Sequence, residues 1–256
     1  MINHEVIDVL RAHSSVRSFT DEPVSQDVID TILACAQRAP TSSNLQAYSI
    51  IQVESMEKRT ALMEYSGGQS WLVKAPLVLL FCADLYRCHK ILAPADKHVL
   101  HNAELFSVAV SDAALVAQKA FIAAQACGLG GVVVGGVRNE TDKMAELFGL
   151  PKLVFPMYAL CLGYPAKVPV QRPRFPIHFV HAVDKYPGLP QEEELCDYDD
   201  ATRKYFLEHT NDPNEFGWIA RGQFAITSKP RYEVGDFLKK AGFLTETKPF
   251  TEDEKP

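Results

Sequence analysis

Four polar side chains that suit an anion stand close together near the N-terminus. They are His13, Ser14, Ser15 and Arg17, between two segments with helical periodicity. An arginine guanidinium matches phosphate or carboxylate, and serine hydroxyls and backbone N–H groups of a tight link add donors. The residue types therefore permit an anion site. Taken alone, however, the cluster favours the simpler interpretation, a polar turn in which Arg17 pairs with Asp21 or Glu22.

A second cluster has the groups to hydrogen-bond a flat heterocycle. The stretch APTSSNLQAYSII (39–51) places hydroxyl and amide side chains just before β-forming residues: Thr41, Ser42, Ser43, Asn44 and Gln46. An ordinary turn is the alternative, because Ser and Asn favour turns.

Two more clusters follow a long helical segment. In GLGGVVVGGVR (128–138), Val133 stands where a dinucleotide-binding G-x-G-x-x-G motif needs its third glycine, and the helix precedes the glycines. Gly130 and Gly131 instead allow close approach of the backbone to a ligand or a strand. Further along, flanking prolines hold Arg172 and Arg174 on an extended backbone.

The composition excludes several classes of protein. The chain has 256 residues, 47% of them hydrophobic, and a net charge of −6, which argues against nucleic acid or an anionic membrane as a main partner. No uninterrupted apolar run reaches the roughly 18 residues of a membrane span, and the N-terminus does not read as a signal peptide. Six scattered cysteines without C-x-x-C predict reduced thiols and a cytoplasmic location.

Helices and strands alternate along the chain, which predicts one α/β or α+β unit with a sheet between helices. The expected helices span 4–13, Ser25 to Pro40, 56–65, 102–128, 140–151, 197–209 and 231–241. Strands are expected at 47–55, 75–84 and 155–165, with a short strand or turn at 130–138. The stretch 75–84 is apolar throughout, which is typical of a strand buried on both faces.

Taken together and in this order, the clusters resemble the flavin-dependent nitroreductase superfamily, and specifically its oxygen-insensitive major NADPH nitroreductase and flavin reductase group. The matching stretches are HSSVRSFTDEPVSQDVIDTIL, RAPTSSNLQAYSII, GGQSWLVKAPLVLLFCAD, CGLGGVVVGGVRN, LFGLPKLVFPMYALCLGYPA and RPRFP. The resemblance covers residues 4–176 and continues weakly to 243.

The resemblance implies an α+β three-layer sandwich, with a central mixed sheet flanked by helices. It implies one nitroreductase-like FMN-binding domain over 1–256, with a core at 4–176 and a C-terminal excursion with a frayed tail at 177–256. It also implies an obligate-type homodimer with FMN bound non-covalently at the interface. The long helix 102–128 would then be the dimer helix.

The same resemblance assigns roles to the four clusters. The residues expected around the FMN phosphate are His13, Ser14, Ser15, Arg17, Arg172 and Arg174. Those expected at the flavin ring are Thr41 and Ser43 from the partner subunit, with Gln69, Gly130 and Gly131. Asn44, Trp71 and Arg221 are expected to face the substrate or nucleotide. Ser14 departs from the family pattern, which usually has an arginine there, so weaker FMN binding is expected.

The implied reaction needs no catalytic side chain, because hydride passes from NAD(P)H to N5 of FMN. Two electrons then reach an acceptor, such as a nitroaromatic, a quinone or a free flavin, in a ping-pong cycle. The loop 208–223 carries Asp212 and Glu215 with only Arg221 nearby. We therefore expect no strong preference for NADPH, so that NADH also acts as a hydride donor.

Three alternatives remain open at this point. A non-catalytic FMN-binding protein would share all the FMN residues. A metal-dependent enzyme would use His98 and His101, with Glu104 and His89 near them. A different reaction on the same scaffold is the third.

Overall fold

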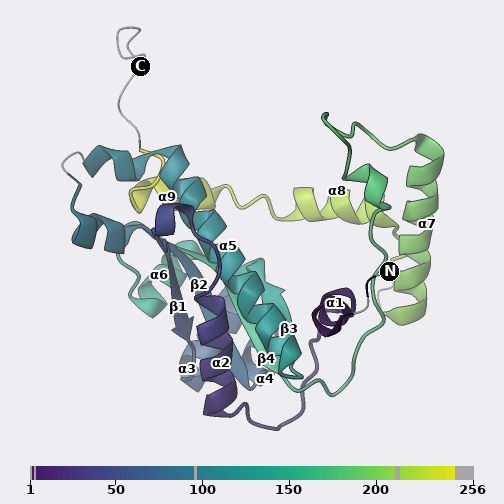
Figure 1. Cartoon of the computed structure of the whole chain (residues 1–256), viewed down its shortest axis with the longest axis horizontal. Helices are drawn as coiled ribbons and strands as arrows, with labels where there is room; N and C mark the ends of the chain where they lie inside the picture. The colour runs from purple at the N-terminus through teal and green to yellow at the C-terminus, as the bar shows by residue number, and fades with distance from the viewer. Residues whose placement is uncertain (1, 3, 95–96, 211–213, 246–256) are drawn as a thin grey trace, which may run out of the picture. The chain divides into compact units, whose positions relative to one another are not determined.

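The computed structural model describes residues 2, 4–94, 97–210 and 214–245, which form two compact units (Figure 1). The first unit comprises Met1–Arg11, Ser15–Lys167 and Arg231–Pro256. The second comprises Ala12–Ser14 and Val168–Pro230.

A four-stranded sheet in the order β1-β2-β4-β3 forms the centre of the first unit. Each neighbouring pair of these strands is antiparallel. A single parallel bridge, between Ser15 and Gly131, adds the N-terminal segment, so parallel pairing enters this sheet only there among the described residues. The strands are Tyr48–Gln52 (β1), Leu77–Asp84 (β2), Gly130–Val134 (β3) and Val154–Gly163 (β4).

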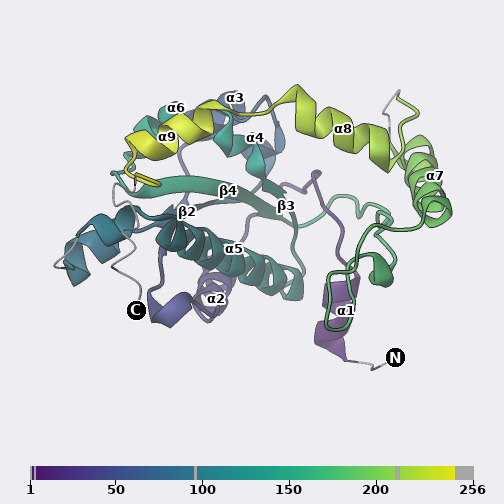
Figure 2. The ribbon, with the colours of Figure 1, turned by 90° about the horizontal axis from the view of Figure 1, so that it is seen from above.

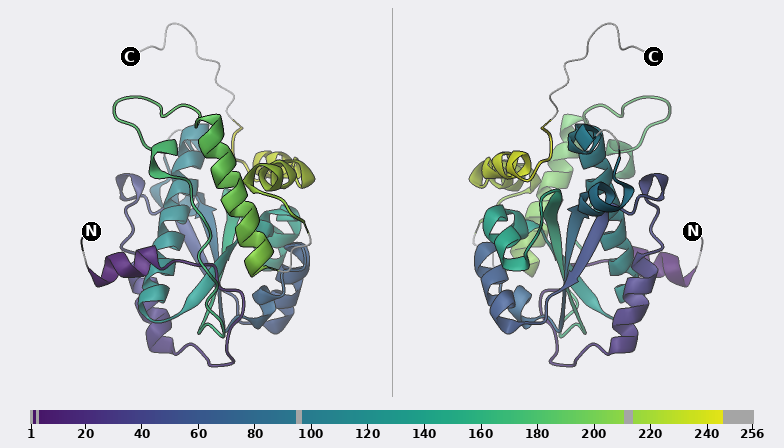
Figure 3. Two further views of the ribbon diagram at one scale, coloured as in Figure 1. Left: turned by 90° about the vertical axis from the view of Figure 1, so that its right-hand side faces the viewer. Right: turned by 90° about the vertical axis from the view of Figure 1, so that its left-hand side faces the viewer.

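Helices cover both faces of the sheet, so the expected α+β three-layer sandwich is confirmed (Figure 2 and Figure 3). One layer holds α2 (Gln26–Ala36) and α5 (Ala103–Ala126), and α1 (Glu5–Arg11) contacts α5. The other layer holds α3 (Met56–Tyr65), α4 (Trp71–Lys74) and α6 (Thr141–Phe148), with α9 (Glu233–Lys240) against α6.

Strand β2 shows why the sheet needs both layers. All eight of its residues are buried. Alternate side chains such as Leu79 and Phe81 join the cluster with α2 and α5, whereas Leu80 and Cys82 join the cluster with α3, α4 and α6. Burial raises the pKa of the Cys82 thiol to about 12. That thiol is therefore protonated at neutral pH, and all six cysteines are free, as expected.

The helix boundaries follow capping chemistry. The predicted N-cap Ser25 is confirmed, because its hydroxyl accepts a hydrogen bond from the N–H of Val28 at 3.4 Å. Asn102 caps α5 in the same way, accepting from the N–H of Leu105 at 2.8 Å. Gly128 ends this helix with a φ of 82°, a conformation that glycine adopts without steric cost.

By length and composition, α5 is the one described helix that is apolar enough to cross a membrane. The core helix of a globular protein passes the same test. Because α5 packs against α2 and against all four strands of the sheet, we interpret it as that core helix.

The second unit is built around α7 (Glu192–His209), light green in Figure 3. This helix begins five residues before the predicted start at 197. An aromatic cluster of Phe175, Tyr198 and Trp218 joins it to α8 (Trp218–Ser228). The sequence interpretation placed a polar loop where α8 forms. No residue of α8 is buried, and the helix contains Gly222, a poor helix former, so its sequence shows little sign of a helix.

Candidate functional site

The segment that carries Ser15 and Arg17 lies along the edge of the sheet. The N–H of Val16 donates to the carbonyl of Gly131 at 2.8 Å, and the N–H of Thr20 donates to the carbonyl of Tyr164 at 2.9 Å. The Val16 side chain is buried. These contacts fix the polar segment as an extension of β3 and of the end of β4.

Gly130 is required by this docking, and Gly131 is required by the close pairing of β3 with β4. A Cβ on Gly130 would lie 2.6 Å from Cγ2 of Val16, and a Cβ on Gly131 would lie 2.4 Å from the carbonyl oxygen of Cys161. Both separations are shorter than real Cβ contacts. Of the two uses expected for these glycines, approach to a strand is therefore present in the structure, and approach to a ligand stays a prediction.

Arg17 meets Trp71 at this edge. The guanidinium carbon lies 5.5 Å from the centroid of the indole, a cation–π distance, and Nη1 donates to the carbonyl of Ser15 at 3.3 Å. Trp71 Nε1 is buried and has no hydrogen-bond partner among the described residues. A buried donor left unpaired costs about 1–3 kcal/mol. The indole N–H therefore favours a ligand or water that accepts its hydrogen bond.

Gln69 precedes Trp71 in a turn formed by two glycines with positive φ, Gly67 and Gly68. Its Nε2 donates to the carbonyl of Ser66 at 2.9 Å. The amide lies so close to Gly136 that a Cβ there would be 2.5 Å from Nε2. The Gln69 side chain, which is expected to contact the flavin ring, is thus held in a tight turn beside Gly136, which follows β3.

A buried arginine joins the chain before α3 to the chain after α4. Arg59 on α3 donates to the carbonyls of Val53, Ala75 and Pro76 at 2.7, 2.6 and 3.2 Å. Burial lowers its pKa, but the guanidinium keeps its charge because arginine is hardly ever deprotonated in proteins. Arg59 therefore ties α3 to the chain that leaves α4, which carries Trp71.

The loop after α2 has an unusual backbone. Ser43, Asn44 and Gln46 have φ values of 47°, 56° and 52°. For residues other than glycine this left-handed region costs roughly 1–2 kcal/mol each. These three side chains are exposed. Backbone strain of this kind persists where surrounding contacts enforce it, and it clusters at functional sites.

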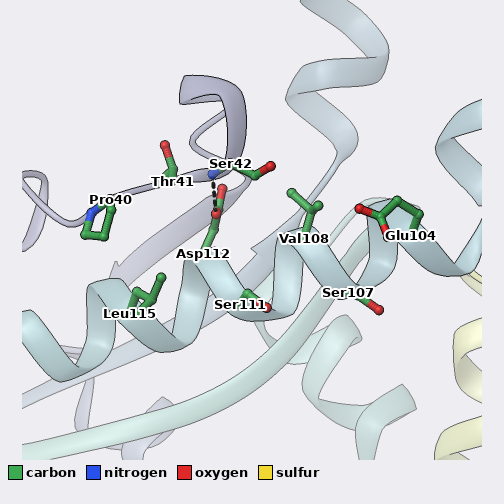
Figure 4. A pocket seen from close by; sticks show the side chains of 9 residues that line it. All are labelled: Pro40, Thr41, Ser42, Glu104, Ser107, Val108, Ser111, Asp112 and Leu115. Atoms are coloured by element: carbon green, nitrogen blue, oxygen red, sulfur yellow. Dashed lines mark hydrogen bonds between the residues drawn. The ribbon is translucent and has the colours of Figure 1, made fainter. Parts of the chain in front are cut away.

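Contacts from α5 enforce this loop. Asp112 accepts from the N–H of Ser42 at 3.1 Å, as Figure 4 shows, and from the N–H of Ala47 at 3.0 Å. Thr41 and Ser42 then line an open hollow of about 340 Å³ over α5. Its other walls are Pro40, Glu104, Ser107, Val108, Ser111, Asp112 and Leu115.

In the second unit, α7 holds the proline-rich segment by its backbone. The hydroxyl of Tyr205 donates to the carbonyl of Val170 at 2.9 Å, and that of Tyr198 donates to the carbonyl of Pro173 at 3.4 Å. Arg172 and Arg174 stay exposed. The predicted pair of cations is therefore presented on a braced, extended backbone.

His13 and Ser14 belong to this second unit. Nε2 of Gln171 donates to the carbonyl of His13 at 3.5 Å, which brings the N-terminal residues beside the segment that carries Arg172. The guanidinium of Arg172 lies 5.1 Å from the ring centroid of Phe206. Segments far apart in the sequence thus gather donors that suit an anion.

Arg221 occupies a different setting from the expected one. Its guanidinium lies 3.5 Å from the centroid of Phe206, and it donates to the carbonyls of Phe216 and Asn214 at 2.9 and 3.2 Å. It therefore closes its own loop, and its contact with a nucleotide stays a prediction. Asp212 lies outside the described residues.

The donors at the sheet edge suit a flat, anionic ligand with polar edges. Arg17 and Ser15 offer anion donors, and Trp71 and Gln69 offer a ring face, an indole N–H and an amide.

Within the described residues no three His, Cys, Asp or Glu side chains are grouped to hold a metal ion. His101, one of the two histidines of the metal alternative, bonds the carbonyl of Gly242 through Nδ1. The side chain of the other, His98, lies outside the described part.

Sequence reasoning missed Asp112 and Arg59. Both act through backbone groups that only the fold brings to them, which no local motif records. The available signal for Asp112 was a carboxylate on the inner side of an Ala-rich helix, where burial requires a partner.

Comparison with known proteins gives the class. The pattern of the "Nitroreductase family" matches residues 10–164, and that of the "Nitroreductase family, C-terminal domain" matches residues 172–246. The chain belongs to the nitroreductase family, which confirms the resemblance.

Individual relatives match almost the whole chain. The "FMN reductase (NADPH)" of Bacillus subtilis (strain 168) is 37% identical over 245 residues, which cover 94% of this chain and 98% of the relative. The "Oxygen-insensitive NADPH nitroreductase" of Salmonella typhimurium is 36% identical over 239 residues, with 93% and 98% covered. A solved B. subtilis nitroreductase shares 36% identity at a TM-score of 0.88, with 94% and 99% covered.

The docking of the N-terminal segment can be tested at Gly130. We expect Gly130→Ala to lower the free energy of unfolding by about 1–3 kcal/mol, because the added methyl overpacks the contact with the Val16 side chain. Gly235→Ala is the control, since its Cβ meets nothing within 4 Å on α9, and it should stabilise by up to about 1 kcal/mol. Chemical denaturation measures both, and equal effects of the two variants would contradict the docking argument.

Proposed function

We propose that this protein is an FMN-dependent NAD(P)H oxidoreductase that reduces nitroaromatics, quinones or free flavins by two electrons in a ping-pong cycle. The observation that carries the proposal is Arg17, fixed at the sheet edge beside the indole of Trp71. The names of the relatives, an FMN reductase and a nitroreductase, support it.

Six residues are proposed as donors to the FMN phosphate: His13, Ser14, Ser15, Arg17, Arg172 and Arg174. Each hydrogen bond from a charged donor to a dianion contributes about 1.5–3 kcal/mol. We infer that the proline-rich segment is braced by α7 so that its arginines are ordered before the phosphate binds.

The polar loop and the turn at Gln69 would hold the flavin ring. Thr41, Ser43 and Asn44 present hydroxyl and amide groups, and Gly130 and Gly131 present backbone N–H groups. FMN, when bound, supplies the redox chemistry by accepting hydride and passing two electrons to the acceptor. The side chains bind and orient, and none is needed as an acid or a nucleophile.

We further propose that the protein is a cytoplasmic homodimer formed through α5, with Thr41 and Ser43 acting at the partner's flavin. Ser107, Ser111 and Leu115 form an exposed stripe along this apolar helix. On α1, which contacts α5, Val6 and Leu10 are exposed as well. Exposed apolar side chains on two helices in contact, beside small serine side chains, suit an interface between two copies of the chain.

The purified protein should show the visible absorption of FMN, and anaerobic NADPH or NADH should bleach it. Re-oxidation by a quinone should restore the colour with a two-electron stoichiometry. A protein that takes up no FMN would refute the proposal. A yellow protein that neither nucleotide bleaches would identify a non-catalytic FMN-binding protein instead.

Nucleotide preference is a separate prediction. We expect kcat/KM with NADH to equal that with NADPH within about threefold, because the loop 208–223 has few cations and its Arg221 is bound to backbone carbonyls. Steady-state rates with a quinone acceptor measure both. A preference for NADPH above a hundredfold would show that another part of the chain reads the 2′-phosphate.

The dimer can be tested at Leu115, whose side chain is exposed on α5. We expect Leu115→Glu to convert the dimer into monomers, because it places a charge on an apolar face. Met56→Glu, at an exposed position of α3 away from α5, should leave the dimer intact. Light scattering coupled to size-exclusion chromatography gives the masses, and a monomeric parent protein would contradict the proposal.

A further inference from the structure

Helix α5 places a carboxylate in the core. Asp112 is 1% exposed, and its neighbours on α5 include Ala109, Ala113 and Val116, which are all buried. A buried carboxylate is costly unless hydrogen bonds satisfy it. The two bonds come from backbone N–H groups, one to each oxygen, donated by Ser42 and Ala47.

These two donors bracket the strained loop. Between Ser42 and Ala47 stand the three left-handed residues Ser43, Asn44 and Gln46. Inside the loop, the N–H of Leu45 donates to the carbonyl of Ser42 at 2.8 Å. The carboxylate thus binds both ends of the loop at once, with one oxygen for each end.

The residues of the loop show that the strain has a use. Glycine adopts positive φ at no steric cost, yet the three positions hold Ser, Asn and Gln. Their side chains are exposed, so they gain no packing energy in the core from this conformation. The loop therefore keeps polar side chains displayed outward in a conformation that Asp112 enforces, beside the hollow drawn in Figure 4.

We propose that Asp112 is a positioning residue for the flavin site: it clamps the 41–47 loop in the conformation that presents Ser43 and Asn44 to the cofactor. This inference rests on the proposed function. Asp112 itself is buried under the loop and acts only through the backbone of Ser42 and Ala47.

Asp112→Asn tests the clamp directly, because it keeps the size of the side chain but turns one oxygen into an NH₂ group that faces a backbone N–H. We expect FMN to dissociate at least tenfold more readily, measured by the fluorescence of FMN released when the yellow protein is diluted. Asp84→Asn is the matched control. Asp84 is also buried, but its carboxylate binds Ser49 and Arg87, and only its backbone N–H, which the substitution keeps, bonds the loop at Ala47. Its FMN affinity should stay within twofold of the parent.

A second variant removes one donor and leaves Asp112 in place. Ser42 begins a 3₁₀ turn after Thr41, whose φ of −133° and ψ of 149° are compatible with a following proline. Ser42→Pro should weaken FMN binding in the same direction. In both loop variants, hydrogen exchange of amides 43–47 should accelerate while that of β2 stays unchanged, a local effect that general destabilisation would not give.

The outcomes separate this inference from the proposed function. A parent protein that holds no FMN refutes the proposed function. A parent that holds FMN, with Asp112→Asn and Ser42→Pro holding it within twofold, overturns the clamp alone. If Asp112→Asn does not fold, Ser42→Pro decides: weaker FMN binding with faster loop exchange supports the clamp, and unchanged binding contradicts it.

Discussion

The N-terminal segment reaches the sheet because Gly130 of β3 carries no side chain. A Cβ there would collide with Val16, whose N–H donates to the carbonyl of the next residue, Gly131. That contact fixes the position of Arg17 beside Trp71. The packing of Val16 against Gly130 therefore determines where the Arg17 guanidinium lies.

Helix α5 packs with α2 on one face of the sheet. Its apolar side fills the core between α2 and the strands, and the same side carries Asp112, which binds the backbone of a loop about 65–70 residues earlier in the chain. The outer side carries Ser107, Ser111 and Leu115. One helix therefore supports the core, the strained loop and the surface that we propose as the dimer interface.

Much of the fold follows from local patterns in the sequence. The helix over 56–65, the long helix near 102–128 and the fully buried strand near 75–84 all form within a few residues of the expected bounds. Ser55 and Asn102 cap the two helices, and the strand is apolar throughout. Helix α8 was not foreseen, since it buries no residue. Assembly into two units was not foreseen either, because the contacts that define them join distant segments.

The candidate site divides in the same way. The stretches with Ser15, Arg17, Trp71 and Gly131 were identified from their order along the chain, and the structure brings these residues together. The clamp by Asp112 and the tie by Arg59 could not be predicted, because each depends on backbone geometry that only the fold creates. Arg221 was identified from its place in the loop 208–223. In the structure it donates to the carbonyl of Phe216 in the same loop, and its contact with a nucleotide stays a prediction.

We propose that the sheet edge and the strained loop together form the flavin site. Amide hydrogen exchange of the protein with and without FMN tests this proposal most directly. FMN should protect residues 15–17, 41–47 and 69–71, with little change in α3 and α6. Protection confined to other segments, or none while FMN is bound, would contradict it.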